Sequence, residues 1–158
     1  MLRVGDKAPP IDAMTSLGTR FVLAEQQGLC TIVYFFPKAF TPGCTRETKY
    51  FRDNHMELML AGASIVGVST DKHETQCEFA SSMNAPFPMI ADTDLSISRS
   101  YDVLWPIVGL ARRVTYVVSP AGVIEAVFHY EFDVEEHRND VLRFVHQKFR
   151  AGQVGSRA

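Results

Sequence analysis

The chain of 158 residues is 46% hydrophobic and 22% charged, and its 16 basic and 18 acidic side chains give a formal charge of −2. That length fits one domain, which buries roughly two thirds of its unfolded surface. The near-neutral balance offers no landing surface for nucleic acid or for an anionic membrane. No apolar run approaches the ~20 residues of a membrane span, and the amino-terminus lacks a secretory core. We therefore expect a cytoplasmic protein whose three cysteines are reduced.

The first half of the chain predicts a strand–helix–strand unit. Residues Thr31–Phe36 are a continuous apolar run, typical of a strand buried on both faces, and Pro37 ends it because proline cannot donate to a ladder. A helix from about Pro42 to Leu60 and a strand Ser64–Ser69 follow. The two strands should be parallel, because a helix crosses between them. A second helix is expected from about Lys72 to Asn84.

The second half predicts a short helical element, a hairpin and a closing helix. The short element falls between Asp94 and Tyr101. The strands Val114–Val118 and Val123–His129 flank a Ser-Pro-Ala-Gly turn, which predicts an antiparallel hairpin. Apolar residues recur at helical spacing from about Val134 to Phe149.

This order of elements predicts an α/β protein with a thioredoxin-like fold, in which helices flank a mixed central β-sheet. One domain should cover residues 1–150. Residues 151–158 are small and polar, and we expect them to form a flexible tail. Asp133 and Glu136 have the spacing of a capping box at the start of the last helix.

The segment Phe36–Glu47 lies where the central strand meets the first helix, at the edge where open α/β sheets bind ligands. Thr41 followed by Pro42 is typical of an N-cap and a first helical residue. Cys44 then lies in the first turn, near unpaired N–H groups and the positive end of the helix dipole. Both favour a thiolate, the form that nucleophilic and redox chemistry needs. Cys30 precedes the core strand and is expected to be a packing residue.

The string Phe-Pro-x-x-x-Thr-Pro-Gly-Cys-Thr-x-Glu resembles the signature of peroxiredoxins of the bacterioferritin comigratory protein, or peroxiredoxin Q, subfamily. The resemblance continues in order through four later segments: Phe51–Asp53, Gly67–Asp71, Phe87–Asp92 and Arg113–Val118. It implies a thiol-dependent peroxidase without a cofactor, which reduces hydrogen peroxide and organic hydroperoxides through a cysteine sulfenic acid.

The resemblance also implies residue roles. Cys44 is similar to the peroxidatic cysteine, and Thr41 to the hydroxyl that hydrogen-bonds the peroxide and the thiolate. Pro37 would shield the pocket from water, and Arg113 would reach over the thiolate. A guanidinium there would keep the sulfur ionised and orient a peroxide oxygen.

Three further side chains are candidates for supporting roles. Neighbours on a strand face opposite sides, so only one of Arg112 and Arg113 can face the site, and spacing favours Arg113 with Arg112 in solvent. Glu47 lies one helical turn after Cys44 and either buttresses the arginine or lies on the surface. Trp105 belongs to an apolar loop that either packs on the sheet, lines the peroxide pocket or forms a dimer face.

The sequence leaves the fate of the sulfenic acid open. Many members of the subfamily carry a resolving cysteine where this chain has Lys49, and Cys77 falls about one turn before the position that other members use. Either Cys77 forms a transient disulfide with Cys44 that thioredoxin or glutaredoxin reduces, or an external low-molecular-weight thiol resolves the sulfenic acid. A monomer or a weak homodimer is expected.

The sequence fits two other functions, and a metal site, less well. A disulfide reductase of the thioredoxin type would need Cys-x-x-Cys, but position 41 is Thr41. A catalytically idle binding domain would have no reason to combine Thr41, Cys44 and Arg113. His73 and Cys77 have a metal-compatible spacing, but no second pair accompanies them, so we expect no zinc site.

Overall fold

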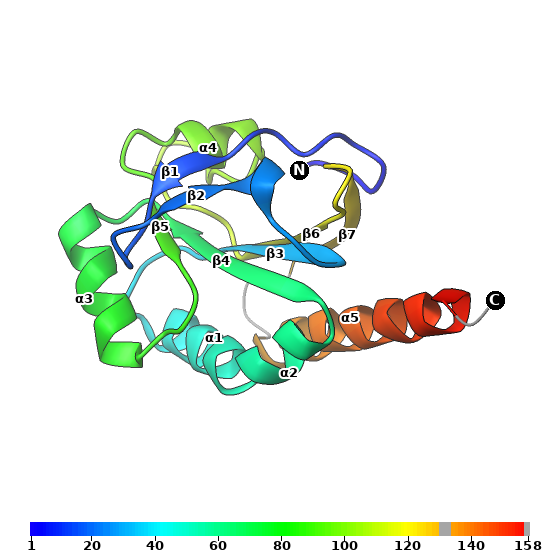
Figure 1. The fold of residues 1–158 in the computed structure, drawn as a ribbon. Helices are drawn as coiled ribbons and strands as arrows, with labels where there is room; N and C mark the ends of the chain where they lie inside the picture. The colour runs from blue at the N-terminus through cyan, green and yellow to red at the C-terminus, as the bar shows by residue number, and fades with distance from the viewer. Residues whose placement is uncertain (130–133, 157–158) are drawn as a thin grey trace.

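A five-stranded mixed sheet forms the centre of the molecule in a computed structural model, which describes residues 1–129 and 134–156 (Figure 1). The strand order is β5-β4-β3-β6-β7, with β4 parallel to both β3 and β5, and β6 antiparallel to β3 and β7. The strands are β3 (Cys30–Phe35), β4 (Ala63–Ser69), β5 (Met89–Ala91), β6 (Val114–Val118) and β7 (Ile124–His129).

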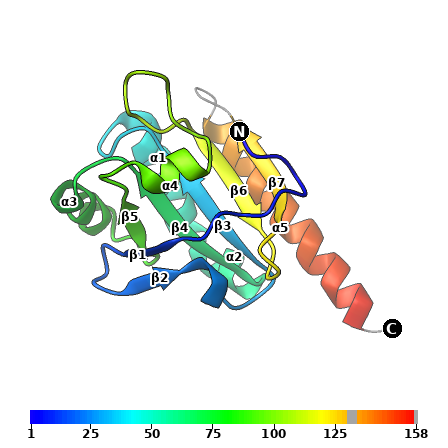
Figure 2. The ribbon, with the colours of Figure 1, turned by 90° about the horizontal axis from the view of Figure 1, so that it is seen from above.

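Helices and a small hairpin cover the two faces of this sheet. They are β1 (Asp12–Met14), β2 (Arg20–Val22), the 3-10 turn η1 (Leu23–Glu25), α1 (Pro42–Asp53), α2 (His55–Leu60), α3 (His73–Met83), α4 (Ser96–Ser100) and α5 (Val134–Ser156). Helices α1, α2 and α5 lie on one face, while α4 and the β1–β2 hairpin lie on the other; α3 lies beside the β5 edge (Figures 1 and 2). Among the described residues, no helix combines the length and the apolar character that crossing a membrane requires.

Strand β3 supplies both halves of the core because its side chains alternate between the faces. Ile32 and Tyr34 pack with Phe51 of α1 in one buried cluster, whereas Val33 and Phe35 pack in the other. All six residues of β3 are buried, as the continuous apolar run predicts for a central strand covered on both sides.

The predicted thioredoxin-like layout is confirmed, including the parallel β3–β4 pair and the antiparallel β6–β7 hairpin. The single helix expected over Pro42–Leu60 was wrong: α1 ends at Asp53 and α2 begins at His55. Asn54 lies between them with φ −105° and ψ 8°, and its side-chain amide donates to the Tyr50 carbonyl at 2.9 Å. Such a local hydrogen bond competes with the helical ladder.

The two ends of the chain differ from expectation as well. The last helix was expected to end at about Phe149. Its backbone instead continues to Ser156 and includes most of the segment expected to be a flexible tail. Asp133 and the side chain of Glu136 lie outside the described residues. The β1–β2 hairpin was not predicted, because strands of three residues are too short to give a clear sequence pattern. The hairpin closes through Gly18, whose φ of 74° suits a tight turn.

Candidate active site

Cys44 lies where β3 passes into α1. Thr41 precedes the helix with extended backbone angles, φ −76° and ψ 151°, and Pro42 is the first helical residue. The ladder begins with the Thr45 N–H, which donates to the Thr41 carbonyl at 2.9 Å. Cys44 is therefore in the first turn, as expected, with its side chain fully buried. Backbone N–H groups of that turn have no partner within the helix and favour negative charge.

Arg113 lies over the Cys44 sulfur and joins it to Glu47. Its Nη2 is 3.5 Å from Cys44 Sγ, and its Nη1 donates to Glu47 Oε2 at 2.6 Å. Arg113 immediately precedes β6, whose first residue pairs with Phe35 at the end of β3, so the antiparallel pairing brings the arginine to Cys44. Both charged side chains are buried, Arg113 to 5% exposure and Glu47 completely. Glu47 thus lies in the site and not on the surface.

The guanidinium keeps its charge in this buried position. Burial by itself would lower the pKa of Arg113, but its electrostatic interactions and hydrogen bonds with Glu47 and Cys44 outweigh burial and raise that pKa above its usual value. A buried ion pair is retained only where geometry and hydrogen bonds offset desolvation, and the two-pronged contact of Arg113 meets that requirement.

Arg112 does not extend into solvent as expected but packs on Trp105. Its guanidinium carbon lies 4.5 Å from the centre of the indole ring, a cation–π contact. Trp105 is 38% exposed in a loop whose tip carries the more exposed Ile107 and Val108. An isolated antiparallel bridge between Leu104 and Ala111 closes this loop at its base.

The loop from Pro37 to Thr41 completes the site. Pro37 is half-buried at the end of the central strand. The Thr41 hydroxyl donates to the Lys38 carbonyl at 2.7 Å and does not cap α1. Because that proton is committed, the oxygen presents its lone pairs as acceptors.

Sequence reasoning missed two side chains near the site. Tyr34 lies beneath α1 and shares a hydrogen bond of 3.2 Å with Thr48; burial raises its pKa well above the usual range. A Cβ at Gly67 would lie 2.7 Å from the Tyr34 ring, so glycine is required on the neighbouring strand. Asp71 accepts a hydrogen bond of 2.8 Å from the Ala39 N–H. Its position after β4, beside the end of β3, is the signal that would have found it.

The other two cysteines differ from Cys44 in their surroundings. Cys30 is buried, and burial raises the pKa of its thiol to about 11, so it stays protonated at neutral pH. Cys77 is half-buried on α3, with its sulfur 3.4 Å from His73 Nε2. It borders a hollow of about 250 Å³ lined by Ser16, Leu17, Ala80, Ser81, Asn84 and Ala85.

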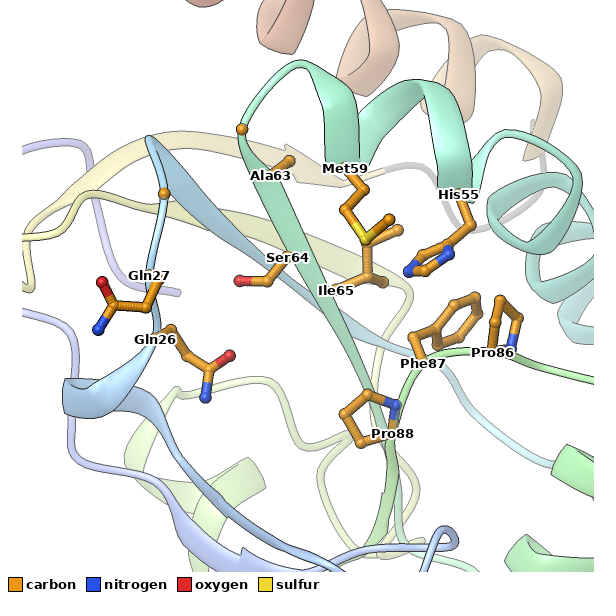
Figure 3. A pocket seen from close by; sticks show the side chains of 12 residues that line it. Gln26, Gln27, His55, Met59, Ala63, Ser64, Ile65, Pro86, Phe87 and Pro88 are labelled. Carbon is orange, nitrogen blue, oxygen red and sulfur yellow. The ribbon is translucent and has the colours of Figure 1, made fainter.

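A larger pocket, of about 390 Å³, opens beside the first residues of β4 (Figure 3). The Cys44 site lies near the opposite, carboxyl end of the parallel strands β3 and β4. His55 and Met59 of α2 face Phe87 and Ile65 across it, and its remaining walls come from Gln26, Gln27, Gly28, Gly62, Ala63, Ser64, Pro86 and Pro88. None of these residues belongs to the Cys44 site.

Comparison with known proteins places this arrangement in a family. Residues 4–127 match the model of the AhpC/TSA family. The chain is 33% identical over 150 residues to peroxiredoxin Bcp of Escherichia coli K12, an alignment that covers 91% of this chain and 96% of that protein. The crystal structure of peroxidoxin BcpB from Mycobacterium tuberculosis superposes with a TM-score of 0.83 at 28% identity, over 96% and 98% of the two chains.

A further structure concerns the alkyl peroxide reduction activity of Xanthomonas campestris bacterioferritin comigratory protein. It has a TM-score of 0.79 and 29% identity over 88% of this chain and 92% of that one. These relatives are peroxiredoxins, thiol-dependent peroxidases with the thioredoxin fold that this chain shares. The chain belongs to the AhpC/TSA family, within the group named Bcp or peroxiredoxin Q.

Proposed function

We propose that Cys44 is the nucleophile through which this chain reduces hydrogen peroxide and organic hydroperoxides. The observation that carries the proposal is the buried Cys44 sulfur, 3.5 Å from Arg113 in the first turn of α1. The guanidinium and the helix terminus both stabilise a thiolate there. The Xanthomonas relative, whose structure concerns alkyl peroxide reduction, supports organic hydroperoxides as substrates.

The reaction follows from the arrangement. The Cys44 thiolate attacks the nearer peroxide oxygen, so an S–O bond forms as the O–O bond breaks. The bonding pair leaves with the far oxygen, which takes a proton and departs as water or an alcohol. Sulfur is oxidised to sulfenic acid and the peroxide is reduced. Arg113 stabilises the charge as it moves between the oxygens, and Glu47 holds the guanidinium in place.

Thr41 and Pro37 have complementary tasks in this proposal. Because its proton is held by the Lys38 carbonyl, the Thr41 oxygen accepts the hydrogen bond of the peroxide O–H and so orients the substrate. Pro37 limits the access of water to the thiolate, since its ring offers no donor.

We infer that an external thiol resolves the sulfenic acid. Phe79 of α3 packs edge-on against Phe40 in the loop before Cys44, with ring centroids 5.2 Å apart. Cys77 precedes Phe79 by two residues, about 200° around the helix, and so faces away from that loop. An intramolecular disulfide would require unwinding at Cys44 or Cys77. Thioredoxin, glutaredoxin or a low-molecular-weight thiol in the cytoplasm would supply the electrons.

The association state belongs to the same proposal. The exposed side chains of Trp105, Ile107 and Val108 form an apolar tip on the loop before β6. Obligate dimers have larger and more apolar interfaces than these three side chains provide. The tip therefore suits a monomer or a weak homodimer better than an obligate dimer.

Peroxide consumption coupled to a thiol reductant tests the function. Wild-type protein is expected to turn over hydrogen peroxide and an organic hydroperoxide, and Cys44→Ser is expected to be inactive. Wild-type turnover in Cys44→Ser would refute the assignment of the nucleophile.

Mass spectrometry under non-reducing conditions, after one equivalent of peroxide, tests the resolution step. A persistent sulfenic acid at Cys44, or a mixed disulfide with added thiol, is expected. A peptide that links Cys44 to Cys77 would contradict the external route. Cys77→Ser serves as the control and should keep full turnover.

A further inference from the structure

The loop between β3 and α1 contains a residue in a strained conformation. Phe40 has a φ of 66°, in the left-handed region that bulky side chains rarely occupy. Strain of this kind persists only where the surrounding contacts hold it. Phe40 directly precedes Thr41 and lies four residues before Cys44, so whatever holds Phe40 also sets the direction in which the chain enters α1.

The residue before Phe40 is tied to the neighbouring strand. The Ala39 N–H donates to Asp71 Oδ2 at 2.8 Å, across 32 positions of sequence. Ala39 is 4% exposed, so its N–H needs a partner within the protein. The Phe40 ring itself rests edge-on against Phe79. The carboxylate of Asp71 therefore fixes the residue immediately before the strained one, in addition to the hydrogen bond from Thr41 to Lys38 within the loop.

Asp71 is itself held in one orientation. The Ser69 hydroxyl donates to the same Oδ2 atom at 2.7 Å, and the Asp71 N–H donates back to Ser69 Oγ at 3.4 Å. Asp71 follows β4 by two residues, and β4 is parallel to β3, so the carboxyl ends of both strands meet at this edge. An ionised acceptor makes a stronger hydrogen bond than a neutral one, which suits a contact that opposes strain.

We propose that Asp71 is a positioning residue for the peroxidase reaction. The proposal rests on the function proposed for Cys44. Asp71 holds the Ala39 N–H, and through it keeps Phe40 left-handed, so that Thr41 and Cys44 meet the peroxide together. Without the acceptor, the backbone at Phe40 relaxes and Thr41 loses its alignment with the sulfur.

Stopped-flow measurement of the second-order rate constant for peroxide tests this role. Asp71→Ala is expected to react about tenfold more slowly, which corresponds to about 1.4 kcal/mol. Asp71→Asn keeps an acceptor oxygen and is expected to stay within about threefold of wild type. A rate within twofold of wild type for Asp71→Ala, or equal losses in both variants, would overturn the proposal.

Asp92 provides the matched control. Asp92 directly follows β5, the strand beside β4, and is buried. It accepts the N–H groups of Ile97 and Ser98 at 3.1 and 2.7 Å. Asp92→Ala is expected to lower the free energy of unfolding while the peroxide rate stays at the wild-type value. A rate loss equal to that of Asp71→Ala would show that general destabilisation explains both and would overturn the positioning role.

Hydrogen exchange separates this proposal from the peroxidase assignment. In Asp71→Ala, amides of residues 38–45 should exchange faster than in wild type, while those of 96–100 remain unchanged; Asp92→Ala should show the reverse. If wild-type protein consumed no peroxide, the proposed function would fail, yet the exchange pattern would still decide whether Asp71 holds the loop. Unchanged exchange over 38–45 in Asp71→Ala would overturn it.

Discussion

The contact of Arg113 with both Glu47 and Cys44 predicts that its role in stability and its role in the reaction can be separated. Arg113→Met removes a charged donor from the sulfur. A hydrogen bond from a charged group contributes about 1.5–3 kcal/mol, so the peroxide rate constant should fall roughly 10- to 150-fold. The same change leaves the buried Glu47 carboxylate without its cation, which costs about 3–5 kcal/mol of stability.

The double variant distinguishes the two effects. Adding Glu47→Gln to Arg113→Met removes both buried charges, so most of the lost stability should return in urea denaturation while the peroxide rate stays low. Arg112→Met is the matched control, because the neighbouring arginine packs on Trp105, and it should keep the wild-type rate. Recovery of the peroxide rate in the double variant would refute the reasoning, since Arg113 would then act only as the counter-ion of Glu47.

Three further predictions concern single side chains. Thr41→Val should slow the peroxide reaction roughly tenfold in stopped-flow assays, whereas Thr41→Ser, which keeps the hydroxyl, should not. Folding raises the pKa of Cys30 from 9.0 to about 11, so the folded state holds the proton more tightly and stability falls between about pH 9 and 11. Wild type should lose roughly 2–3 kcal/mol more than Cys30→Ala across that window in urea titrations, and equal losses would count against burial of the thiol. Trp105→Ala should raise KM for a bulky organic hydroperoxide but not for hydrogen peroxide, or shift the sedimentation coefficient; no change in either would leave the loop with packing alone.

Local rules were sufficient to predict the centre of the fold and the position of Cys44. The apolar run that became β3 and the Thr41-Pro42 boundary both depend on neighbouring residues, so they can be read without the tertiary structure. Side-chain alternation along a strand allowed only one of Arg112 and Arg113 to face the site, and the spacing to the following strand favoured Arg113; the structure brings Arg113 to Cys44.

Local sequence rules could not predict contacts between elements that lie far apart in the sequence. The packing of Arg112 on Trp105 depends on how the loop before β6 folds back. Glu47 was equally compatible with the surface, and only the antiparallel pairing of β3 with β6 brings Arg113 within its reach. The helix break at Asn54 required a choice between two hydrogen-bonding patterns that the apolar spacing does not distinguish.

The site of the first oxidation tests the central claim most directly. Wild-type protein is treated with less than one equivalent of hydrogen peroxide, trapped with a reagent specific for sulfenic acid and digested for mass spectrometry. The trapped group should be on the peptide that contains Cys44, with Cys30 and Cys77 unmodified. Labelling of Cys77 or Cys30 before Cys44, or equal labelling of all three, would contradict the account.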